Sequence, residues 1–196
     1  KILIVSPHPD DEVLGCGGTI LKHKKNKDKI YWIICTSINN SKNFSNSQKN
    51  IRSREIQKII NFFRFDYVYD LEYSTKEINQ IDENKIIQDF TSIIKQIKPT
   101  TIYLPYINDA HSDHRIITTS FNACIKPFRY PFLEKIMMYE TLSETNLNFL
   151  LKRKFLANVY NDISPFIKKK IKAINIFKSE ISKHPFPRSE DSIKSL

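Results

Sequence analysis

Two short segments of this chain concentrate side chains that bind metals. The first, Ser6–Glu12, reads SPHPDDE and directly follows the apolar run Ile2–Val5. The second, Asp109–His114, reads DAHSDH and comes soon after the apolar run Thr101–Leu104. Imidazole and carboxylate groups bind zinc, ferrous iron and other divalent metals, and a catalytic zinc site usually has three such ligands and one open position. We therefore expect the two segments to form one metal site.

Three ligands can be drawn from these segments. His8 and Asp11 come from the first segment, and the second offers His111 and His114. These two histidines lie three residues apart at the start of an expected helix, so both can face the same side. The spacing alone does not decide which of them is the ligand.

The remaining polar side chains suit acid–base catalysis. Asp10 adjoins a ligand and can reach a water on the same metal, which lowers the pKa of that water to about 7. An imidazole that is not a ligand can, in its charged form, stabilise an oxyanion or protonate a leaving amine. Asp113 can hold one of the histidines in the required tautomer. The residue types therefore predict a metal-assisted hydrolysis.

Strand-like and helix-like runs alternate over most of the chain and must position these segments. Strands are expected at Ile2–Val5, Tyr31–Thr36, Tyr67–Leu71, Thr101–Leu104, Lys135–Tyr139 and Phe155–Tyr160. Helices are expected from Val13 into the polar stretch Lys22–Lys29, at Gln48–Phe63, Glu83–Ile97 and Asp113–Cys124, and from Ser164 to about Ser182, before an irregular tail. Such alternation predicts crossover units and a mainly parallel sheet, and ligands bind beyond the carboxyl ends of such strands. We predict one α/β domain over residues 1–196, Rossmann-like in layout, with helices flanking the sheet.

The same segments resemble the motifs of a known family. Pro7–Glu12, with Gly15–Gly18 after it, looks like the signature of the PIG-L/LmbE-like de-N-acetylases, and Asp109–Arg115 resembles their second motif, usually His-Pro-Asp-His. Arg52–Glu55 is similar to the family's Arg-x-x-Glu helix, and the region from Asp162 to Glu180 is similar to its C-terminal part. The family consists of metal-dependent hydrolases that remove acetyl groups from N-acetylated amino sugars and related conjugates. The resemblance therefore implies an N-deacetylase.

The resemblance also implies a role for each polar group. It assigns metal binding to His8, Asp11 and His114, the general base to Asp10, and a charged acid or oxyanion stabiliser to His111, with Asp113 as the partner of His111. In that role we expect His111 to produce the alkaline limb of a bell-shaped pH profile. Arg52 matches a position that contacts substrate in relatives, and we add Arg54, Asp109 and Arg188 as candidate substrate-binding residues. The polar loop Ser37–Ser47 is expected to contribute further contacts.

Composition restricts the setting of such an enzyme. The net charge is +10, which reflects either lysines on solvated helix faces or attraction to an anionic partner. The lysine run Lys168–Lys170 is not interleaved with aromatic residues, which disfavours a platform for single-stranded nucleic acid. The three scattered cysteines indicate a reducing, cytoplasmic setting, and no apolar run reaches the ~20 residues of a membrane span. The sequence leaves open a longer native C-terminus and a homo-oligomer.

These observations combine into one predicted function. We expect a zinc-dependent hydrolase, with ferrous iron or another divalent metal as the alternative cofactor. Its expected partner is a small molecule, an N-acetylated amino sugar or its nucleotide, lipid or glycan conjugate, and no nucleic acid is expected. The tail His184–Ser189 resembles family members of surface-polysaccharide metabolism. Two alternatives remain: a deacylase of another small N-acyl amine, and a basic nucleic-acid-binding domain whose clusters are structural.

Overall fold

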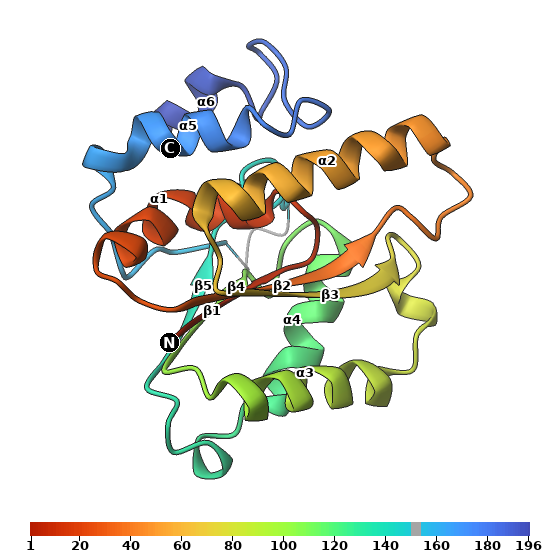
Figure 1. Cartoon of the computed structure of the whole chain (residues 1–196), viewed down its shortest axis with the longest axis vertical. Coiled ribbons are helices and arrows are strands. Elements are labelled where there is room, and N and C mark those ends of the chain that lie inside the picture. The colour runs from red at the N-terminus through yellow and green to blue at the C-terminus, as the bar shows by residue number, and fades with distance from the viewer. Residues whose placement is uncertain (150–153) are drawn as a thin grey trace.

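Five strands form one parallel sheet in the computed structural model, which describes residues 1–149 and 154–196 (Figure 1). The strands are β1 (Ile2–Ser6), β2 (Ile30–Ser37), β3 (Tyr67–Ser74), β4 (Thr101–Pro105) and β5 (Lys135–Tyr139). Their order is β3-β2-β1-β4-β5, and each neighbouring pair is parallel. The chain moves outward from β1 to β3 and then crosses to the other side of β1. This reversal leaves a crevice at the carboxyl ends of β1 and β4, where open α/β sheets bind ligands.

Helices cover both faces of the sheet. Helices α1 (Asp11–Lys25), α2 (Asn46–Phe63), α5 (Ile167–Ile174) and α6 (Glu190–Ser195) lie on one side, and α3 (Glu83–Ile97) and α4 (Ser112–Cys124) lie on the other (Figure 1). Among the described residues, short 3-10 helices span Ile78–Gln80, Pro127–Arg129 and Ser164–Phe166. Each face of the sheet has its own apolar core. Because both faces are covered, all five residues of β1 and of β4 are buried. The predicted α/β class with a parallel sheet is confirmed.

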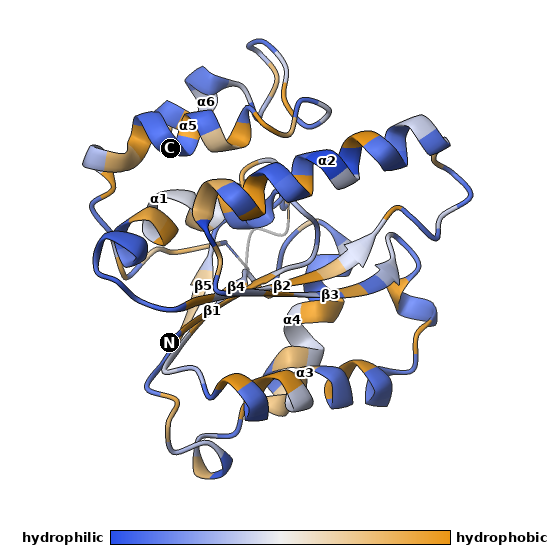
Figure 2. Ribbon diagram, viewed as in Figure 1, coloured by the Kyte–Doolittle hydropathy of each residue, from blue (hydrophilic) through white to orange (hydrophobic). Residues whose placement is uncertain are grey.

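The helices follow from local sequence signals. Ser45 and Gln48 form a reciprocal capping box at the start of α2. In α3 the apolar residues recur at helical spacing and are buried, and the helix ends before Pro99. Figure 2 shows the result as hydrophobic strands between helices with one apolar and one polar face. Within residues 1–149 and 154–196, no helix is long and apolar enough to cross a membrane.

Three expected elements differ in the structure. Phe155–Tyr160 is not a strand: it has no sheet neighbour, and Leu156 and Tyr160 are more than 80% exposed, at 84% and 83%. The helix expected to reach Ser182 ends at Ile174, because the chain then turns so that the Lys178 N–H donates to Oε1 of Glu55, at 2.9 Å. The tail, expected to be irregular, contains α6. Strand and helix propensity favoured the first two assignments, and tertiary contacts decided otherwise.

Candidate active site

The two predicted segments meet at the carboxyl edge of the sheet. The first leaves β1 at Ser6 and enters α1 at Asp11, and the second leaves β4 at Pro105 and enters α4 at Ser112. β1 and β4 are adjacent, so the loops that follow them lie side by side. At Gly15 the first helix passes so close to β5 that a β-carbon would overlap the ring of Tyr139. This close packing fixes the start of α1 against the sheet.

His8 and His114 each have one ring nitrogen on a carboxylate and turn the other toward the partner histidine. Nε2 of His8 lies 3.1 Å from Oδ2 of Asp113, and Nδ1 of His114 lies 2.8 Å from Oδ2 of Asp109. The other nitrogens, Nδ1 of His8 and Nε2 of His114, are 3.3 Å apart. A carboxylate accepts an N–H, so each pair places the proton of the neutral ring on the outer nitrogen. Two inner lone pairs then face each other.

Asp11 completes a ligand set at the same point. Its Oδ2 lies 3.2 Å from Nε2 of His114 and 3.5 Å from Nδ1 of His8, and the three ligand atoms are all within 4.8 Å of one another. Asp11 and His114 are buried. Two lone pairs and a carboxylate oxygen converging on one buried point form a donor set that fits a divalent cation.

The charges of His8, Asp11 and His114 depend strongly on one another. Burial lowers the pKa of His8 and His114, but the adjacent carboxylates outweigh burial and raise these pKa values to about 9 and about 10. Burial raises the pKa of Asp11, but the two histidines hold it well below its usual range. In the absence of a metal, protons therefore supply the positive charge that the carboxylates require. A metal that replaces those protons would bind in competition with them.

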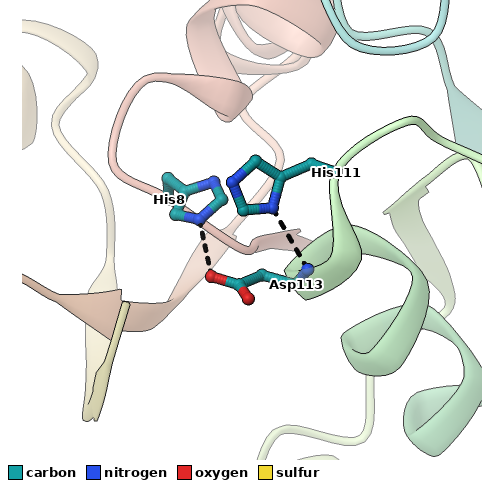
Figure 3. Close-up of side chains that lie close together, drawn as sticks. All are labelled: His8, His111 and Asp113. Atoms are coloured by element: carbon teal, nitrogen blue, oxygen red, sulfur yellow. Dashed lines mark hydrogen bonds and ion pairs between the residues drawn. The ribbon is translucent and has the colours of Figure 1, made fainter. Parts of the chain in front are cut away.

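His111 lies next to His8, but its ring bonds to the backbone of Asp113 (Figure 3). Its ring centroid is 4.5 Å from that of His8, and its Nδ1 accepts the backbone N–H of Asp113 at 3.1 Å. His8, His111 and Asp113 also approach within ligand distance, but the Asp113 carboxylate there accepts from His8 Nε2 and from the backbone N–H of Lys76, at 2.9 Å. The ligand set with Asp11 and His114 is therefore the better metal site.

Two features of His111 differ from what the sequence led us to expect. The Asp113 carboxylate was expected to hold His111, but it holds His8. His111 was also expected to be charged, but burial and then the neighbouring charge of His8 lower its pKa to about 4. With Nδ1 as acceptor, neutral His111 carries its proton on Nε2. His111 can thus donate a hydrogen bond without being an imidazolium.

Asp10 is buried beside the ligands and in an unusual backbone conformation. It is the N-cap residue of α1 with a φ of 137°, yet its side chain makes no capping bond. Its backbone N–H donates to Oε2 of Glu12 at 3.0 Å, and its Oδ2 accepts from Nη1 of Arg188 at 2.7 Å. Burial raises the pKa of Asp10 to about 7, although Arg188 opposes the shift. A pKa near neutrality suits a general base.

A cavity of about 310 Å³ opens over these residues. Besides the polar groups just described, its lining includes loop residues after β2 and side chains of α2: Ser37, Ile38, Asn39, Phe44, Arg52, Ser53 and Ile56. Glu144, Glu180 and Arg188 also line it. Arg52 donates to the carbonyl oxygen of Pro9 at 2.9 Å and pairs with Glu180. Part of the loop Ser37–Ser47 therefore lines the cavity, and its contact with a substrate stays a prediction.

Two of the expected substrate-binding residues lie elsewhere. Arg54 is exposed and is not among the residues that line the cavity, because residues two apart in a helix do not share a face and Arg52 occupies the cavity side of α2. Asp109 is 1% exposed, holds Nδ1 of His114 and is not among the residues that line the cavity, so it lies behind the candidate metal ligands.

A family model described as "PIG-L: GlcNAc-PI de-N-acetylase" matches residues 3–125, which is more than half of the chain. This chain belongs to the PIG-L family. It is a metal-dependent N-deacetylase, a hydrolase, and N-acetylated amino sugars are the general class of substrate that the family match supports.

Solved structures share the fold of this PIG-L member. The N,N′-diacetylchitobiose deacetylase of Pyrococcus horikoshii, in complex with its inhibitor MPG, matches with a TM-score of 0.69 and 21% identity over 93% of this chain and 71% of its own. GalB, the 4-carboxy-2-hydroxymuconate hydratase of Pseudomonas putida, matches with a TM-score of 0.72 and 14% identity over 100% of this chain and 83% of its own. The zinc-inhibited form of teicoplanin deacetylase Orf2 matches with a TM-score of 0.68 and 12% identity over 91% of this chain and 84% of its own. At sequence identities this low, these matches show a shared fold and nothing more.

The sequence did not reveal Glu144 as a residue of the PIG-L cavity. Glu144 follows β5 and lies beyond the family match, and its Oε1 accepts from Nη2 of Arg188 at 3.3 Å. Burial raises its pKa. Its position after a strand of the parallel sheet was the available signal, because such positions face the ligand edge.

Proposed function

We propose that this PIG-L member is a zinc-dependent enzyme that removes the acetyl group from an N-acetylated amino sugar or from its nucleotide, lipid or glycan conjugate. The observation that carries the proposal is the convergence of two histidine nitrogens and one carboxylate. Nδ1 of His8, Nε2 of His114 and Oδ2 of Asp11 lie within ligand distance of one another, and separate carboxylates orient both histidines. The family match to an N-deacetylase model supports the same chemistry.

His8, Asp11 and His114 would hold the metal. Such a metal, when bound, lowers the pKa of water and polarises the amide carbonyl. Zinc is the proposed ion because a mixed nitrogen and carboxylate set with three protein ligands is typical of catalytic zinc, and ferrous iron is the alternative that the same donors accept.

Protein groups around the ligands divide the proton transfers. Asp10 accepts the proton of the attacking water as general base, for which its raised pKa and its place beside Asp11 suit it. His111 donates a hydrogen bond from Nε2 to the amide oxygen as negative charge develops there, and its neutral form is sufficient for that role. Protonated Asp10 then returns the proton to the leaving amine.

The cavity suits a sugar. Its lining combines hydroxyl, amide and charged groups with the apolar side chains of Ile38, Phe44 and Ile56. A pyranose has the same two characters, since hydroxyl groups surround a ring whose faces expose C–H bonds. We further propose that the reaction serves surface-polysaccharide synthesis in the cytoplasm, consistent with three cysteines that are free and buried.

The test is acetate release from a panel of N-acetyl compounds. The protein is stripped with a chelator and reloaded with one equivalent of Zn²⁺ or Fe²⁺ per chain, because teicoplanin deacetylase has a zinc-inhibited form. The panel contains N-acetylglucosamine, N,N′-diacetylchitobiose, UDP-N-acetylglucosamine and an N-acetylated amino acid. We expect turnover of at least one sugar, loss of turnover after stripping, and recovery with metal. Turnover of the amino acid derivative alone would favour a deacylase of another N-acyl amine, and no acetate from any compound would contradict the proposal.

A further inference from the structure

Arg188 connects the base to the side of the cavity that lies outside the family match. That match ends at residue 125, whereas Arg188 belongs to the C-terminal segment. Its Nη1 donates to Oδ2 of Asp10 at 2.7 Å and to Oε2 of Glu180 at 3.4 Å. A residue distant from the catalytic motifs thus touches the base directly.

The neighbours of Arg188 hold its guanidinium in place. Nε donates to Oγ of Ser143 at 2.7 Å, and Nη2 donates to Oε1 of Glu144 at 3.3 Å. The side chain is only 13% exposed. A guanidinium has five N–H donors, and these contacts together with those to Asp10 and Glu180 use four of them. Arg188 therefore has little capacity left for a substrate.

Asp10, in contrast, has few restraints of its own. Its side chain does not cap α1, although it occupies the N-cap position. Among residues 1–149 and 154–196, Arg188 is the one donor to its carboxylate, and this donor binds Oδ2. Within the part of the chain that the structure describes, no donor reaches Oδ1 of Asp10. Oδ1 is therefore available to accept a proton, while the hydrogen bond from Arg188 holds Oδ2 in place.

We propose that Arg188 is a positioning residue that orients the Asp10 carboxylate, and that Ser143, Glu144 and Glu180 serve to hold Arg188. The sequence predicted that Arg188 binds substrate, and the present role replaces that prediction. The inference rests on the proposed function, which assigns the base to Asp10. A base acts only within hydrogen-bond reach of its proton, and a displacement of about 1 Å can cost ~10²-fold in rate. A carboxylate that rotates freely would lose that reach.

The test is a double-mutant cycle on the metal-loaded enzyme. Single variants R188M, R188K and D10N and the double variant D10N/R188M are assayed for kcat, KM, zinc content and melting temperature. We expect R188M to lower kcat by ~10²-fold or more, up to the whole contribution of the base, with KM and zinc content close to those of the unsubstituted enzyme. R188K retains the charge and one donor position, so it should recover part of kcat. In the D10N background, R188M should change kcat by less than about threefold, because its target is already lost.

A matched control is K183M, which removes an exposed cation from the same segment and should leave kcat unchanged. A raised KM with unchanged kcat in R188M or R188K would overturn the inference in favour of substrate binding. Fully additive losses in the double variant would overturn it as well. If R188M does not fold, R188K and D10N/R188K provide the same cycle. Undiminished activity of D10N would refute the base assignment in the proposed function and this inference with it, whereas a slow D10N with additive losses refutes the inference alone.

Discussion

The cavity has a floor and a wall that are built in opposite ways. The floor consists of the residues around the metal point: His8, Asp10 and His111 line the cavity, and Asp11, Asp109, Asp113 and His114 lie behind them. It comes from the two segments that lead from β1 into α1 and from β4 into α4, within the family match. The wall consists of Arg52, Glu144, Glu180 and Arg188, which come from three distant regions of the chain, because Glu180 and Arg188 are eight residues apart. Floor residues Asp11 and His114 are almost completely buried, whereas the wall side chains retain 13–29% exposure.

This difference assigns different tasks to the two regions. Buried carboxylates are costly unless they are paired, so the floor holds its side chains in fixed pairs that suit a reaction common to a family. The wall pairs are partly solvated and involve residues that the family model does not cover. We therefore expect floor substitutions to affect metal and kcat, and wall or loop substitutions to affect KM, except where a wall residue acts through the floor.

The largest effect should follow from removal of a floor ligand. His114→Ala removes one of the three proposed ligands and leaves the buried carboxylates of Asp11 and Asp109 without the imidazole that contacts both. Metal content should therefore fall from about one per chain to near zero, and activity should vanish. Elemental analysis of the purified variant measures this. His184→Ala, which removes an exposed histidine, is the control and should retain metal. Equal metal content in both variants would show that His114 is not a ligand.

Most of the floor could be predicted from the sequence, because its residues are close together in the chain. The triplet of His8, Asp10 and Asp11 follows one strand, and His111 to His114 begin one helix, so a parallel sheet is enough to bring them together. Sequence could not decide which ring nitrogen each carboxylate holds, and for that reason Asp113 was assigned to His111 and Asp109 to the substrate. These are differences of a few ångströms in side-chain direction.

The wall was less accessible, because its contacts join residues far apart in sequence. In the sequence, Glu180 appeared only as the end of the region similar to the family's C-terminal part, and its pairing with Arg52 depends on the turn that follows the end of α5 at Ile174. The sequence analysis identified Arg188 as a site residue. Its hydrogen bond to Asp10, however, depends on the path of the C-terminal tail, which no local sequence pattern predicts. Likewise, Phe155–Tyr160 has strand composition but no neighbouring strand.

The second largest effect should separate the base from the ligands. Asp10→Asn keeps the size of the side chain and its contact with Arg188 but removes the proton acceptor. We expect kcat to fall by ~10²–10⁴-fold while the metal remains bound. Steady-state kinetics together with metal analysis provide the measurement, and Asp191→Asn on the exposed face of α6 is the control. A variant that turns over at nearly the unsubstituted rate would exclude Asp10 as the base.

His111 should contribute somewhat less, and in its neutral form. His111→Ala should lower kcat by ~10²–10³-fold, the range for loss of one oxyanion donor, with metal retained. An imidazolium is lost as the pH rises through its pKa, and here that pKa is lowered to about 4. His111 is then already neutral at pH 5 and above, so it should produce no alkaline limb between pH 7 and 9. If the unsubstituted enzyme has an alkaline limb that disappears in His111→Ala, the working enzyme uses the charged form.

The two carboxylates behind the metal-binding histidines should have intermediate effects. Asp109→Asn and Asp113→Asn each replace an acceptor of a histidine N–H by an amide, and such partners usually contribute 10–100-fold in metal affinity. Competition with a chelator of known affinity gives the two constants. Asp109 serves a fully buried histidine and Asp113 a partly exposed one, so Asp109→Asn should be the more damaging. The reverse order would indicate that Asp113 has a further role toward substrate.

The smallest effect tests whether the loop side of the cavity contacts the sugar. Phe44 is half-buried in the loop after β2 and lines the cavity beside Ile38 and Ile56. Truncation to alanine removes part of an apolar contact, of the order of 1 kcal/mol, which corresponds to about a fivefold rise in KM with kcat nearly unchanged. Phe44 belongs neither to the metal point nor to the residues that contact Arg188. The Phe44→Ala variant should therefore contain as much metal as the unsubstituted enzyme. Arg54→Ala is the matched comparison, since it lies on the neighbouring helix but outside the cavity, and it should leave both constants unchanged. An unchanged KM in Phe44→Ala would mean that the substrate does not reach this side, and a loss of kcat would place Phe44 with the floor and remove the distinction between the two regions.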